Sequence, residues 1–451
     1  MFGRVLIANR GEIAVRIIRA CRELGVESVA VYSTADRDSL HVAMADRAIC
    51  VGPPPAAQSY LNISSIVGAA ETTGAQAIHP GYGFLAENAG FALACEENDI
   101  VFVGPRPDSI EAMGDKASAR RTMDAAGVPI VPGSSDLEGV DAARAWADEI
   151  GYPVLLKASA GGGGKGMRRV DSPGELDEAY VAAAREAHAS FSNGTLYLEK
   201  ALRQARHVEI QALCDGNGGV LTLGERDCSI QRRHQKLIEE SPSPAVTPRL
   251  REALEDAADR ACETLRYRGA GTIEFLACGE DFYFIEMNTR LQVEHPVTEL
   301  VTGIDLVRGQ LSVAAGDPLP ATGRAPRFGH SIEIRINAED PARGFVPTPG
   351  QITRFRPPLG PGVRLDTHVY EGYEVPSYYD SLLGKVVVWD EDRPRAIARA
   401  VRALEELEIE GVPTTRELGL EILESGDFRA GATTTTWLGD VATRFASLAA
   451  S

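Results

Sequence analysis

The segment from Ile285 to His295 carries a polar side chain at every second position. The alternating residues are Glu286, Asn288, Arg290, Gln292 and Glu294. A period of two is the repeat of an extended strand, whose alternate side chains share one face. A half-buried surface strand has the same alternation, but two acids, an amide and an arginine can also bind metal ions and phosphate. We therefore interpret the segment as one strand of a functional site with five polar groups on one face.

A predicted β-hairpin overlaps the start of this segment. Thr272–Leu276 and Phe282–Glu286 are rich in β-branched and aromatic residues, and a Gly-containing stretch separates them. A three-residue loop, 279–281, would set Glu274 opposite Glu286, with their Cβ atoms about 4.5–5.5 Å apart. Two carboxylates so close repel each other unless a cation lies between them, and oxygen ligands favour Mg²⁺ or Mn²⁺ over zinc. An offset register that keeps the carboxylates apart is the alternative.

A glycine-rich segment lies upstream, between a buried-type strand that ends at Lys157 and a strand that begins at Met167. Its glycines let successive backbone N–H groups approach an anion, and Lys157 and Lys165 add positive charge. The segment is not a P-loop, because it leads into a strand rather than a helix. A flexible linker is the alternative, but the flanking strands favour a lid that closes on nucleotide phosphates.

The composition is that of an ordinary globular protein. The chain has 451 residues, 44% hydrophobic and 24% charged, which predicts two to four domains. A net charge of −18 argues against nucleic acid as a partner. Seven scattered cysteines without a Cys-x-x-Cys pair favour reduced thiols and a cytoplasmic location. We find no signal peptide and no membrane span.

Strand and helix patterns follow one another in a definite order. The first 114 residues alternate strand and helix, as in a parallel, doubly wound α/β domain, but lack the G-x-G-x-x-G turn of a dinucleotide site. Helices are predicted at 13–24, 88–98, 116–126, 249–265 and 394–407, and strands at 4–8, 29–31, 100–103, 207–212 and 332–337. The fold class is therefore α/β and α+β.

A lid with a glycine-rich loop, followed by an acidic hairpin, is the organisation of the ATP-grasp ligases. Seven segments resemble those of biotin carboxylases, in the same order along nearly the whole chain. They are Ala8–Ala14, His79–Leu85, Met113–Lys116, Lys157–Met167, Gln231–Lys236, Glu286–Pro296 and Arg335–Asp340. The resemblance implies a doubly wound N-terminal domain, an ATP-grasp lid and core, and a C-terminal biotin carboxylase domain. The expected boundaries are 1–114, 115–204, 205–330 and 331–446.

The resemblance also implies the reaction. Bicarbonate attacks the γ-phosphate of ATP, bound with Mg²⁺ or Mn²⁺; the resulting carboxyphosphate breaks down, and N1 of biotin is carboxylated. The chain would be an ATP-dependent carbon–nitrogen ligase, the biotin carboxylase subunit of an acetyl-CoA or acyl-CoA carboxylase. The alternatives are a subunit of pyruvate or another carboxylase, another ATP-grasp ligase, or a nucleotide-binding regulatory subunit. A regulatory subunit would be expected to lack Glu294, Arg290 or a metal carboxylate, and the chain has them all.

Matching positions imply the binding residues. The nucleotide positions are Lys116, Lys157, Gly163, Gly164, Glu199, Lys200, Ala201, Leu202, His207, Gln231 and His234. Metal would be held by Glu274 and Glu286, with Asn288 as a further ligand or supporting group. Tyr82 and Gly83 match biotin-contacting positions. On the residues alone, 199–202 is equally well an ordinary strand end with a solvated Glu-Lys pair.

The implied bicarbonate site contains cations and a base. Its positions are Lys236, Arg290, Gln292, Val293 through its backbone, and Glu294. The catalytic residues implied are Arg290, Glu294, Arg335 and Lys236. Glu294 would act as general base for bicarbonate and, by proton relay, for biotin N1, and a raised pKa would suit that work. Arg335 would stabilise the enolate-like oxygen of deprotonated biotin.

The expected partners follow from an absent motif. No methionine adjoins a lysine, so the Met-Lys-Met pattern of a biotin attachment site is missing. We expect a separate biotin carboxyl carrier protein and separate carboxyltransferase subunits, unless the chain is a fragment of a longer polypeptide. A homodimer is expected by analogy with relatives. The sequence does not identify the final carboxyl acceptor, whether acetyl-CoA, another acyl-CoA or pyruvate.

Overall fold

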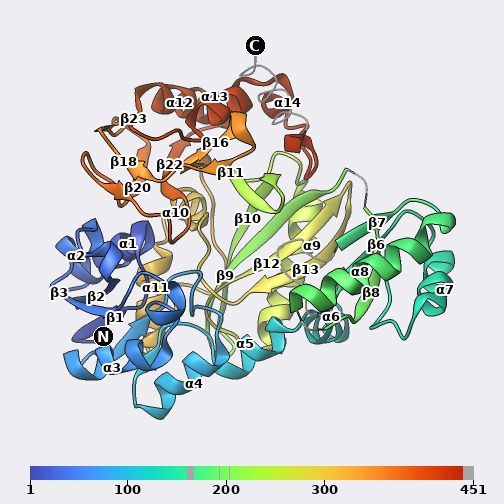
Figure 1. Cartoon of the computed structure of the whole chain (residues 1–451), viewed down its shortest axis with the longest axis horizontal. Helices are drawn as coiled ribbons and strands as arrows, with labels where there is room; N and C mark the ends of the chain where they lie inside the picture. The colour runs from blue at the N-terminus through green and yellow to red at the C-terminus, as the bar shows by residue number, and fades with distance from the viewer. Residues whose placement is uncertain (160–166, 192, 203, 440–451) are drawn as a thin grey trace.

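The computed structural model describes residues 1–159, 167–191, 193–202 and 204–439. The predicted phosphate-binding residues Gly163 and Gly164 lie outside the described residues, as does the end of the expected region 331–446. Figure 1 shows three parts around a long central sheet: the N-terminal region in blue, a lid in green and the C-terminal region in red.

The N-terminal region contains a five-stranded parallel sheet with the order β3-β2-β1-β4-β5. Its strands are β1 (Arg4–Ile7), β2 (Glu27–Ser33), β3 (Arg47–Gly52), β4 (Ala77–His79) and β5 (Val101–Phe102). Its helices are α1 (Gly11–Glu23), α2 (Leu40–Met44), α3 (Ile63–Thr73), α4 (Ala89–Glu97) and α5 (Pro107–Gly114), with short 3₁₀ turns η1 (Thr34–Asp36) and η2 (Ala56–Gln58). Val5 and Ile7 pack with α1, whereas Leu6 between them packs with α3 and α4. Both faces of the sheet are therefore covered, as in the predicted doubly wound fold.

The lid is a small three-stranded antiparallel sheet with the order β7-β6-β8. Its elements are α7 (Val140–Ile150), β6 (Val154–Ala158), β7 (Met167–Val170), η3 (Pro173–Glu175), α8 (Leu176–Phe191) and β8 (Leu196–Lys200). The preceding helix, α6 (Lys116–Ala125), packs into the core of the central sheet instead. Alanines of α7 and α8 pack on Val154, Leu156 and Leu198 in a core of their own. Because β6 and β7 pair from Val154 to Lys157, the glycine-rich segment connects two hydrogen-bonded strands, as predicted.

The central sheet runs β13-β12-β9-β10-β11-β15-β22-β20, with β14 beside β10. Its strands are β9 (Arg206–Asp215), β10 (Val220–Arg232), β11 (Gln235–Ser241), β12 (Arg268–Cys278), β13 (Asp281–Asn288), β14 (Gly323–Arg324), β15 (His330–Asn337), β20 (Val363–Thr367) and β22 (Leu382–Asp390). Helices α9 (Pro248–Thr264), α10 (His295–Thr302) and α11 (Leu306–Ala314) lie beside it. The antiparallel pairing of β11 with β15 makes one sheet of the predicted core and the predicted C-terminal domain.

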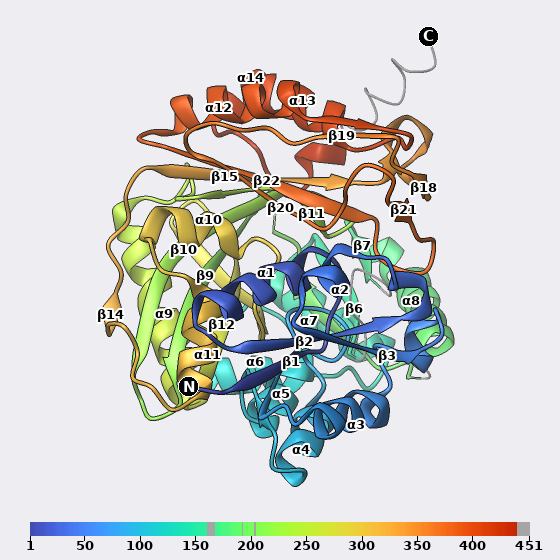
Figure 2. The same cartoon turned by 90° about the vertical axis from the view of Figure 1, so that its left-hand side faces the viewer.

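The C-terminal region covers the far end of this sheet with helices, seen at the top of Figures 1 and 2. They are α12 (Arg393–Glu406), α13 (Arg416–Glu424) and α14 (Gly426–Arg429). Short strand pairs complete it: β16 (Glu339–Asp340) with β17 (Val346–Pro347), β18 (Gly350–Gln351) with β21 (Glu374–Val375), and β19 (Arg354–Arg356) with β23 (Glu408–Glu410), plus η4 (Pro341–Arg343). Ala396, Ala400 and Leu404 of α12 pack on Ile332 and Ile334 of β15.

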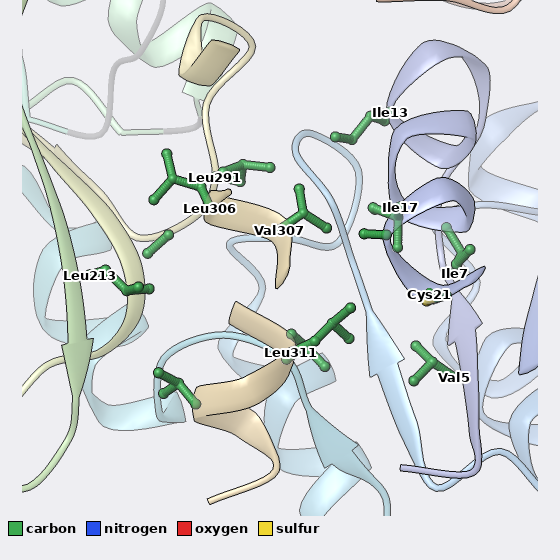
Figure 3. Close-up of a cluster of buried hydrophobic side chains, with 14 of the residues drawn as sticks. Val5, Ile7, Ile13, Ile17, Cys21, Leu213, Leu291, Leu306, Val307 and Leu311 are labelled. Carbon is green, nitrogen blue, oxygen red and sulfur yellow. The ribbon is translucent and has the colours of Figure 1, made fainter. Parts of the chain in front are cut away.

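One hydrophobic cluster crosses from the N-terminal region to the central sheet. It joins residues of β1 and α1 to α11 and β9, so the two regions share a core rather than meeting at a polar surface. Figure 3 shows side chains of this cluster, among them Val5, Ile7, Ile17, Leu213, Leu306, Val307 and Leu311. Burial of apolar area at such a boundary holds the two regions at a fixed separation.

The predicted helices and strands agree with the structure to within a few residues, with one correction. The strand expected through Glu294 ends at Asn288. The N–H of Thr289 donates to the carboxylate of Glu87 instead of a neighbouring strand, and α10 begins at His295, with Pro296 in its first turn. All seven cysteines lie in the described part of the chain, and none of them forms a disulfide. Within the described ranges, none of the helices is both long and apolar enough to span a membrane.

Candidate active site

The hairpin of β12 and β13 brings Glu274 and Glu286 directly opposite each other, as predicted. The prediction succeeded through two compensating differences. The loop has two residues rather than three, because Cys278 pairs with Asp281, and this shifts the register by one. An irregularity follows, in which Phe275 pairs with Phe284 and Glu274 with Glu286, so Ile285 is an extra residue that restores the register.

The environments of these two carboxylates differ. Glu286 is 42% exposed, and its Oε2 lies 3.9 Å from Nζ of Lys116. Partial burial and the charge of Glu274 raise the pKa of Glu286. Glu274 is buried, which by itself would raise its pKa, but Lys236 and His207 outweigh burial and hold that pKa well below its usual range. Glu274 is therefore an anion. Glu286 is partly exposed to solvent, and a bound cation would stabilise its charged form.

Asn288 lies beside the same pair. Its Nδ2 donates to Oε1 of Glu274 over 2.8 Å, and its Oδ1 accepts from Nη2 of Arg290 over 2.8 Å. Two carboxylates and an amide oxygen at one end of a hairpin are the hard donors that Mg²⁺ and Mn²⁺ prefer. The three residues therefore fit the implied metal in donor chemistry.

Lys236 on β11 is the centre of the buried charges. Its Nζ lies 2.6 Å from Glu209, 3.0 Å from Glu274 and 2.5 Å from Glu294. Burial alone would lower the pKa of the ammonium, but Cys228 and the three carboxylates outweigh it and raise that pKa well above its ordinary value. One fixed cation therefore touches both the predicted metal carboxylate and the predicted base.

Glu294 reaches this point from the N-cap position of α10 rather than from a strand. Its second oxygen lies 2.9 Å from Nη2 of Arg335, whose guanidinium also pairs with Glu239 at 2.5 Å. Burial would raise the pKa of Glu294, but Lys236 and Arg335 lower it far below its ordinary value. A raised pKa would suit a base, but in this arrangement of charges the carboxylate of Glu294 is an anion held between Lys236 and Arg335.

Arg290 and Gln292 also face the hairpin, although they lie beyond its end. Arg290 donates from Nε to Glu87 over 2.8 Å and from Nη2 to Asn288. Gln292 donates to Oε1 of Glu274 over 2.8 Å. Three of the alternating polar residues thus meet at one place through an irregular segment, because side-chain bonds replace the strand ladder that ends at Asn288.

The predicted nucleotide residues line the lid and the adjoining strands. Glu199 is buried and pairs with Lys157 and Arg120. Lys200 turns away: its Nζ donates to the carbonyl oxygens of Gly151 and Tyr152 over 2.8 and 3.1 Å. The backbone N–H groups of Lys200 and Ala201 bond to Pro132 and Pro153. Those two N–H groups are therefore occupied within the protein, and Leu202, half-buried, follows them.

Three further nucleotide candidates lie where β9 and β10 approach the hairpin. Nε2 of His207 lies 3.0 Å from Oε2 of Glu274, and Nδ1 lies 3.4 Å from the amide of Gln231. Burial would lower the pKa of His207, but Glu274 reverses the shift and raises it. His234 has a positive φ of 68° in the turn after β10. Burial and the positive charge of Lys157 lower the pKa of His234, which places that ring on the lysine side of the site.

Tyr82 lies on the opposite side, towards Arg335. Its hydroxyl donates to Oε1 of Glu12 on α1. Burial and Glu12 raise the pKa of Tyr82 well above its ordinary value, and the positive charge of Arg335 opposes them. Gly83, with a φ of 68°, is exposed beside it. Tyr82 and Gly83 thus adjoin the arginine end of the charge cluster rather than the metal end.

Sequence reasoning missed several residues that organise the site. Arg226 on β10 is fully buried and donates to Glu209, Gln211 and Gln292. The other missed residues are Glu12, Glu87, Arg120, Glu209, Cys228, Glu239 and Lys385. The alternation of His207, Glu209 and Gln211 along β9 is the same signal that pointed to 286–294. The remaining residues carry no comparable pattern.

The parallel N-terminal domain, the small lid and the metal-type hairpin together define an ATP-grasp ligase. Three family models match successive stretches of the chain: "Biotin carboxylase, N-terminal domain" over residues 1–110, "Carbamoyl-phosphate synthase L chain, ATP binding domain" over 115–322, and "Biotin carboxylase C-terminal domain" over 333–440. The biotin carboxylase of Nostoc sp. is 54% identical over 444 residues, covering 97% of this chain and 98% of the relative. Biotin carboxylase 1 of Bacillus subtilis is 54% identical over 442 residues, with the same coverage.

Solved structures agree. A biotin carboxylase–β,γ-ATP complex from Campylobacter jejuni superposes with a TM-score of 0.94 at 49% identity, covering 98% of this chain and 99% of that one. The biotin carboxylase domain dimer of Hydrogenobacter thermophilus 2-oxoglutarate carboxylase, with MgADP, ADP and bicarbonate, gives 0.92 at 50% identity and 98% coverage of both. The chain belongs to the biotin carboxylase family. The predicted fold class, function and enzyme class, an ATP-dependent ligase, are thereby confirmed.

Proposed function

We propose that the chain carboxylates N1 of carrier-bound biotin with ATP and bicarbonate, through carboxyphosphate, and that the residues around Lys236 do the chemistry. One observation carries the assignment of roles. Lys236 lies 3.0 Å from Glu274 and 2.5 Å from Glu294. A single cation therefore links the carboxylate proposed for metal binding to the carboxylate proposed as base.

The nucleotide end of the site supplies positive charge and oxygen ligands. Glu274, Glu286 and Asn288 would hold Mg²⁺ or Mn²⁺, which when bound neutralises charge on the phosphate oxygens. Lys116 and Lys157 face the same end, and Gly163 and Gly164 would complete the phosphate cradle. Residues 199–202, with His207, Gln231 and His234, would contact the rest of the nucleotide. The pairing of Arg120 with Glu199 supports the role of Lys157. Because Glu199 pairs with both Arg120 and Lys157, it does not fully neutralise the lysine, whose remaining charge is available to phosphate.

The bicarbonate end places a base among cations. Arg290 presents a guanidinium fork, held by Glu87 and Asn288, which suits a planar oxyanion. Gln292, the backbone of Val293 and Lys236 would complete the site. Glu294 is ionised, so it would accept the proton of bicarbonate, whose oxygen then attacks the γ-phosphorus and displaces ADP.

The biotin end is formed by Arg335, Tyr82 and Gly83. Arg335 would hold the ureido oxygen as N1 loses its proton, because a fixed guanidinium stabilises developing negative charge. Glu294 lies 2.9 Å from the same guanidinium, so the base and the oxyanion partner are adjacent. The proximity of base and partner supports a proton relay from biotin N1 towards Glu294.

The partners and location extend this proposal. Relatives of known structure include a 2-oxoglutarate carboxylase domain dimer and the biotin carboxylase subunit of pyruvate carboxylase. We propose a homodimer that receives biotin on a separate carrier protein and passes carboxybiotin to carboxyltransferase subunits. The carboxyltransferase subunits would determine the carboxyl acceptor, which is acetyl-CoA, another acyl-CoA or pyruvate. The seven cysteines form no disulfide, which supports a cytoplasmic location. For the expected regions 1–114, 115–204, 205–330 and 331–446, the family-model limits support the boundaries near 114 and 330. The separate hydrophobic core of the lid supports the boundary at 204.

ADP release separates the candidate functions. We expect release that requires bicarbonate and Mg²⁺ and is stimulated by free biotin. Turnover indifferent to bicarbonate and biotin would favour another ATP-grasp ligase, and no turnover would favour a regulatory subunit.

Lys236→Gln tests the role given to the central cation. The Michaelis constant for bicarbonate should rise about tenfold or more, because a hydrogen bond from a charged donor is lost. The control is Arg251→Gln, which removes a different ion pair, to buried Glu225. An unchanged bicarbonate constant in Lys236→Gln, measured by ADP release, would contradict the assignment.

A further inference from the structure

Lys385 on β22 is a fully buried cation that the steps above do not use. Its Nζ donates to the carbonyl oxygen of Val293 over 2.7 Å. The same Nζ lies 3.1 Å from Oε1 of Glu12 and 3.9 Å from Oδ2 of Asp366. A buried ammonium is kept only where such partners compensate its desolvation, so the contacts of Lys385 constrain the groups around it.

The hydrogen bond from Lys385 to the carbonyl oxygen of Val293 affects the bicarbonate end of the site. Val293 lies between Gln292 and Glu294, in the irregular segment before α10. Because the peptide group is planar, holding the carbonyl of Val293 fixes the peptide that leads into Glu294. Lys385 therefore sets the direction in which the proposed base leaves the backbone.

The contact with Glu12 acts on the biotin end. Oε1 of Glu12 accepts from both Lys385 and the hydroxyl of Tyr82. Oε2 of Glu12 is buried and has no hydrogen-bond partner among the described residues. Glu12 thus depends on Lys385 for its charge balance, and Tyr82 depends on Glu12 for the position of its hydroxyl.

The surrounding charges keep Lys385 protonated. Burial would lower the pKa of its ammonium, but Glu12, Glu333 and Asp366 outweigh burial and the opposing charge of Arg364, and raise that pKa. The cation is therefore permanent at neutral pH. It also joins three parts of the chain, since Glu12 lies on α1, Val293 precedes α10 and Lys385 lies on β22.

We propose that Lys385 is a positioning residue that holds Tyr82 and Val293 in one geometry, so that the biotin and bicarbonate ends of the site form together. The inference rests on the proposed function, because it takes the roles of Tyr82 and Val293 from it. The expected signature is a linked change in two Michaelis constants, for biotin and for bicarbonate, without a change in the constant for ATP.

Lys385→Met tests this. The Michaelis constants for free biotin and for bicarbonate should each rise about tenfold or more, the usual effect of losing a hydrogen bond from a charged group. The constant for ATP should stay within about twofold. Arg251→Met is the matched control, because it removes one of the two arginines that pair with buried Glu225 and should leave all three constants unchanged. Thermal unfolding of both variants reports the general cost of losing a buried ion pair.

A double-mutant cycle adds a sharper measurement. Tyr82→Phe should raise the constant for biotin alone. Combined with Lys385→Met it should add little further, because both changes break the same connection through Glu12. Additive effects on the biotin constant, or an unchanged bicarbonate constant in Lys385→Met, would overturn the inference.

A second variant keeps the test decisive if Lys385→Met does not fold. Glu12→Gln preserves shape and an acceptor oxygen but removes the charge that balances Lys385, and a smaller joint rise of both constants is expected. A change confined to kcat would overturn the inference. Failure of the proposed function looks different: the unaltered enzyme would then show no stimulation of ADP release by biotin.

Discussion

Glu286 and Glu294 belong to the same short stretch, yet their pKa values shift in opposite directions. Partial burial raises the pKa of Glu286, and the charge of Glu274, which lies opposite it across the hairpin, raises that pKa further. Burial also acts on Glu294, but Lys236 and Arg335 outweigh it. At the residue scale, a bound cation would stabilise the charged form of Glu286, whereas Lys236 and Arg335 already neutralise the charge of Glu294. The difference agrees with the roles proposed for these two residues, a metal ligand for Glu286 and a base for Glu294.

Glu286→Gln should reduce turnover more than about 100-fold, because losing a metal ligand costs at least as much as losing a group that supports one. The measurement is ADP release as a function of Mg²⁺ concentration. Glu280→Gln, an exposed change in the turn of the same hairpin, is the control and should have no effect. An unaltered Mg²⁺ dependence in Glu286→Gln would refute its role.

Arg335→Ala should spare nucleotide binding but lower biotin-stimulated ADP release by about 100-fold, the typical effect of removing one oxyanion donor. Bicarbonate-dependent ADP release without biotin should change little, because Lys236 still pairs with Glu294 when Arg335 is removed. The two rates are measured side by side. Equal loss of both would show that Arg335 serves an earlier step.

At the scale of elements, residues 131–133 between α6 and α7, called the hinge of the lid below, are packed tightly against β8. A Cβ atom on Gly133 would lie 2.2 Å from the carbonyl oxygen of Leu198 and 3.0 Å from Cα of Glu199. The next residue, Ser134, donates its N–H to the same carbonyl over 2.8 Å. The hinge and the buried Glu199 can therefore keep their spacing only with glycine at position 133.

Gly133→Ala should lower the free energy of unfolding by about 1–3 kcal/mol, the usual cost of overpacking, and raise the Michaelis constant for ATP. Urea unfolding and ADP release measure the two effects. Gly174→Ala lies in the exposed turn η3 of the lid and its added Cβ meets open space, so it should lower neither the stability nor the affinity for ATP. Equal behaviour of the two variants would argue against a packed hinge.

At the scale of the whole molecule, neutral histidines are buried in the N-terminal region and where it meets the C-terminal region. Burial lowers the pKa of His41 to about 4, and of His79 and His368 to about 3. The unfolded chain, with the ordinary value of 6.5, binds these protons first. Their contribution to stability is therefore complete above pH 6.5 and is lost as the pH falls towards 3.

His79→Gln isolates one of these groups. The Nδ1 atom of His79 accepts the N–H of Gly81 over 3.0 Å, and the amide oxygen of glutamine can replace it. The free energy of unfolding of the unaltered protein should fall more steeply from pH 6.5 to pH 4 than that of the variant, by up to about 1.4 kcal/mol per pH unit. Urea unfolding at three pH values measures the difference between the two proteins. Other titrating groups, such as Glu239 with a pKa raised to about 7, are present in both proteins and cancel in this difference.

Exposed His188 is the control position. His188→Gln should follow the unaltered protein at every pH, since the change lies at the protein surface. Parallel profiles for His79→Gln and the unaltered protein would contradict the buried neutral state of His79.

The amino-acid sequence by itself determined the elements, because hydrophobic periodicity and turn residues are local properties. It also determined the opposition of Glu274 and Glu286, where a shorter loop and a bulge at Ile285 cancelled. The tertiary structure decided the rest. Arg226 on β10 and Lys385 on β22 reach the site from strands far apart in sequence, and no residue spacing predicts their roles. The low pKa of Glu294 likewise required Lys236 and Arg335 to approach it, since charge interactions depend on distance in space rather than along the chain.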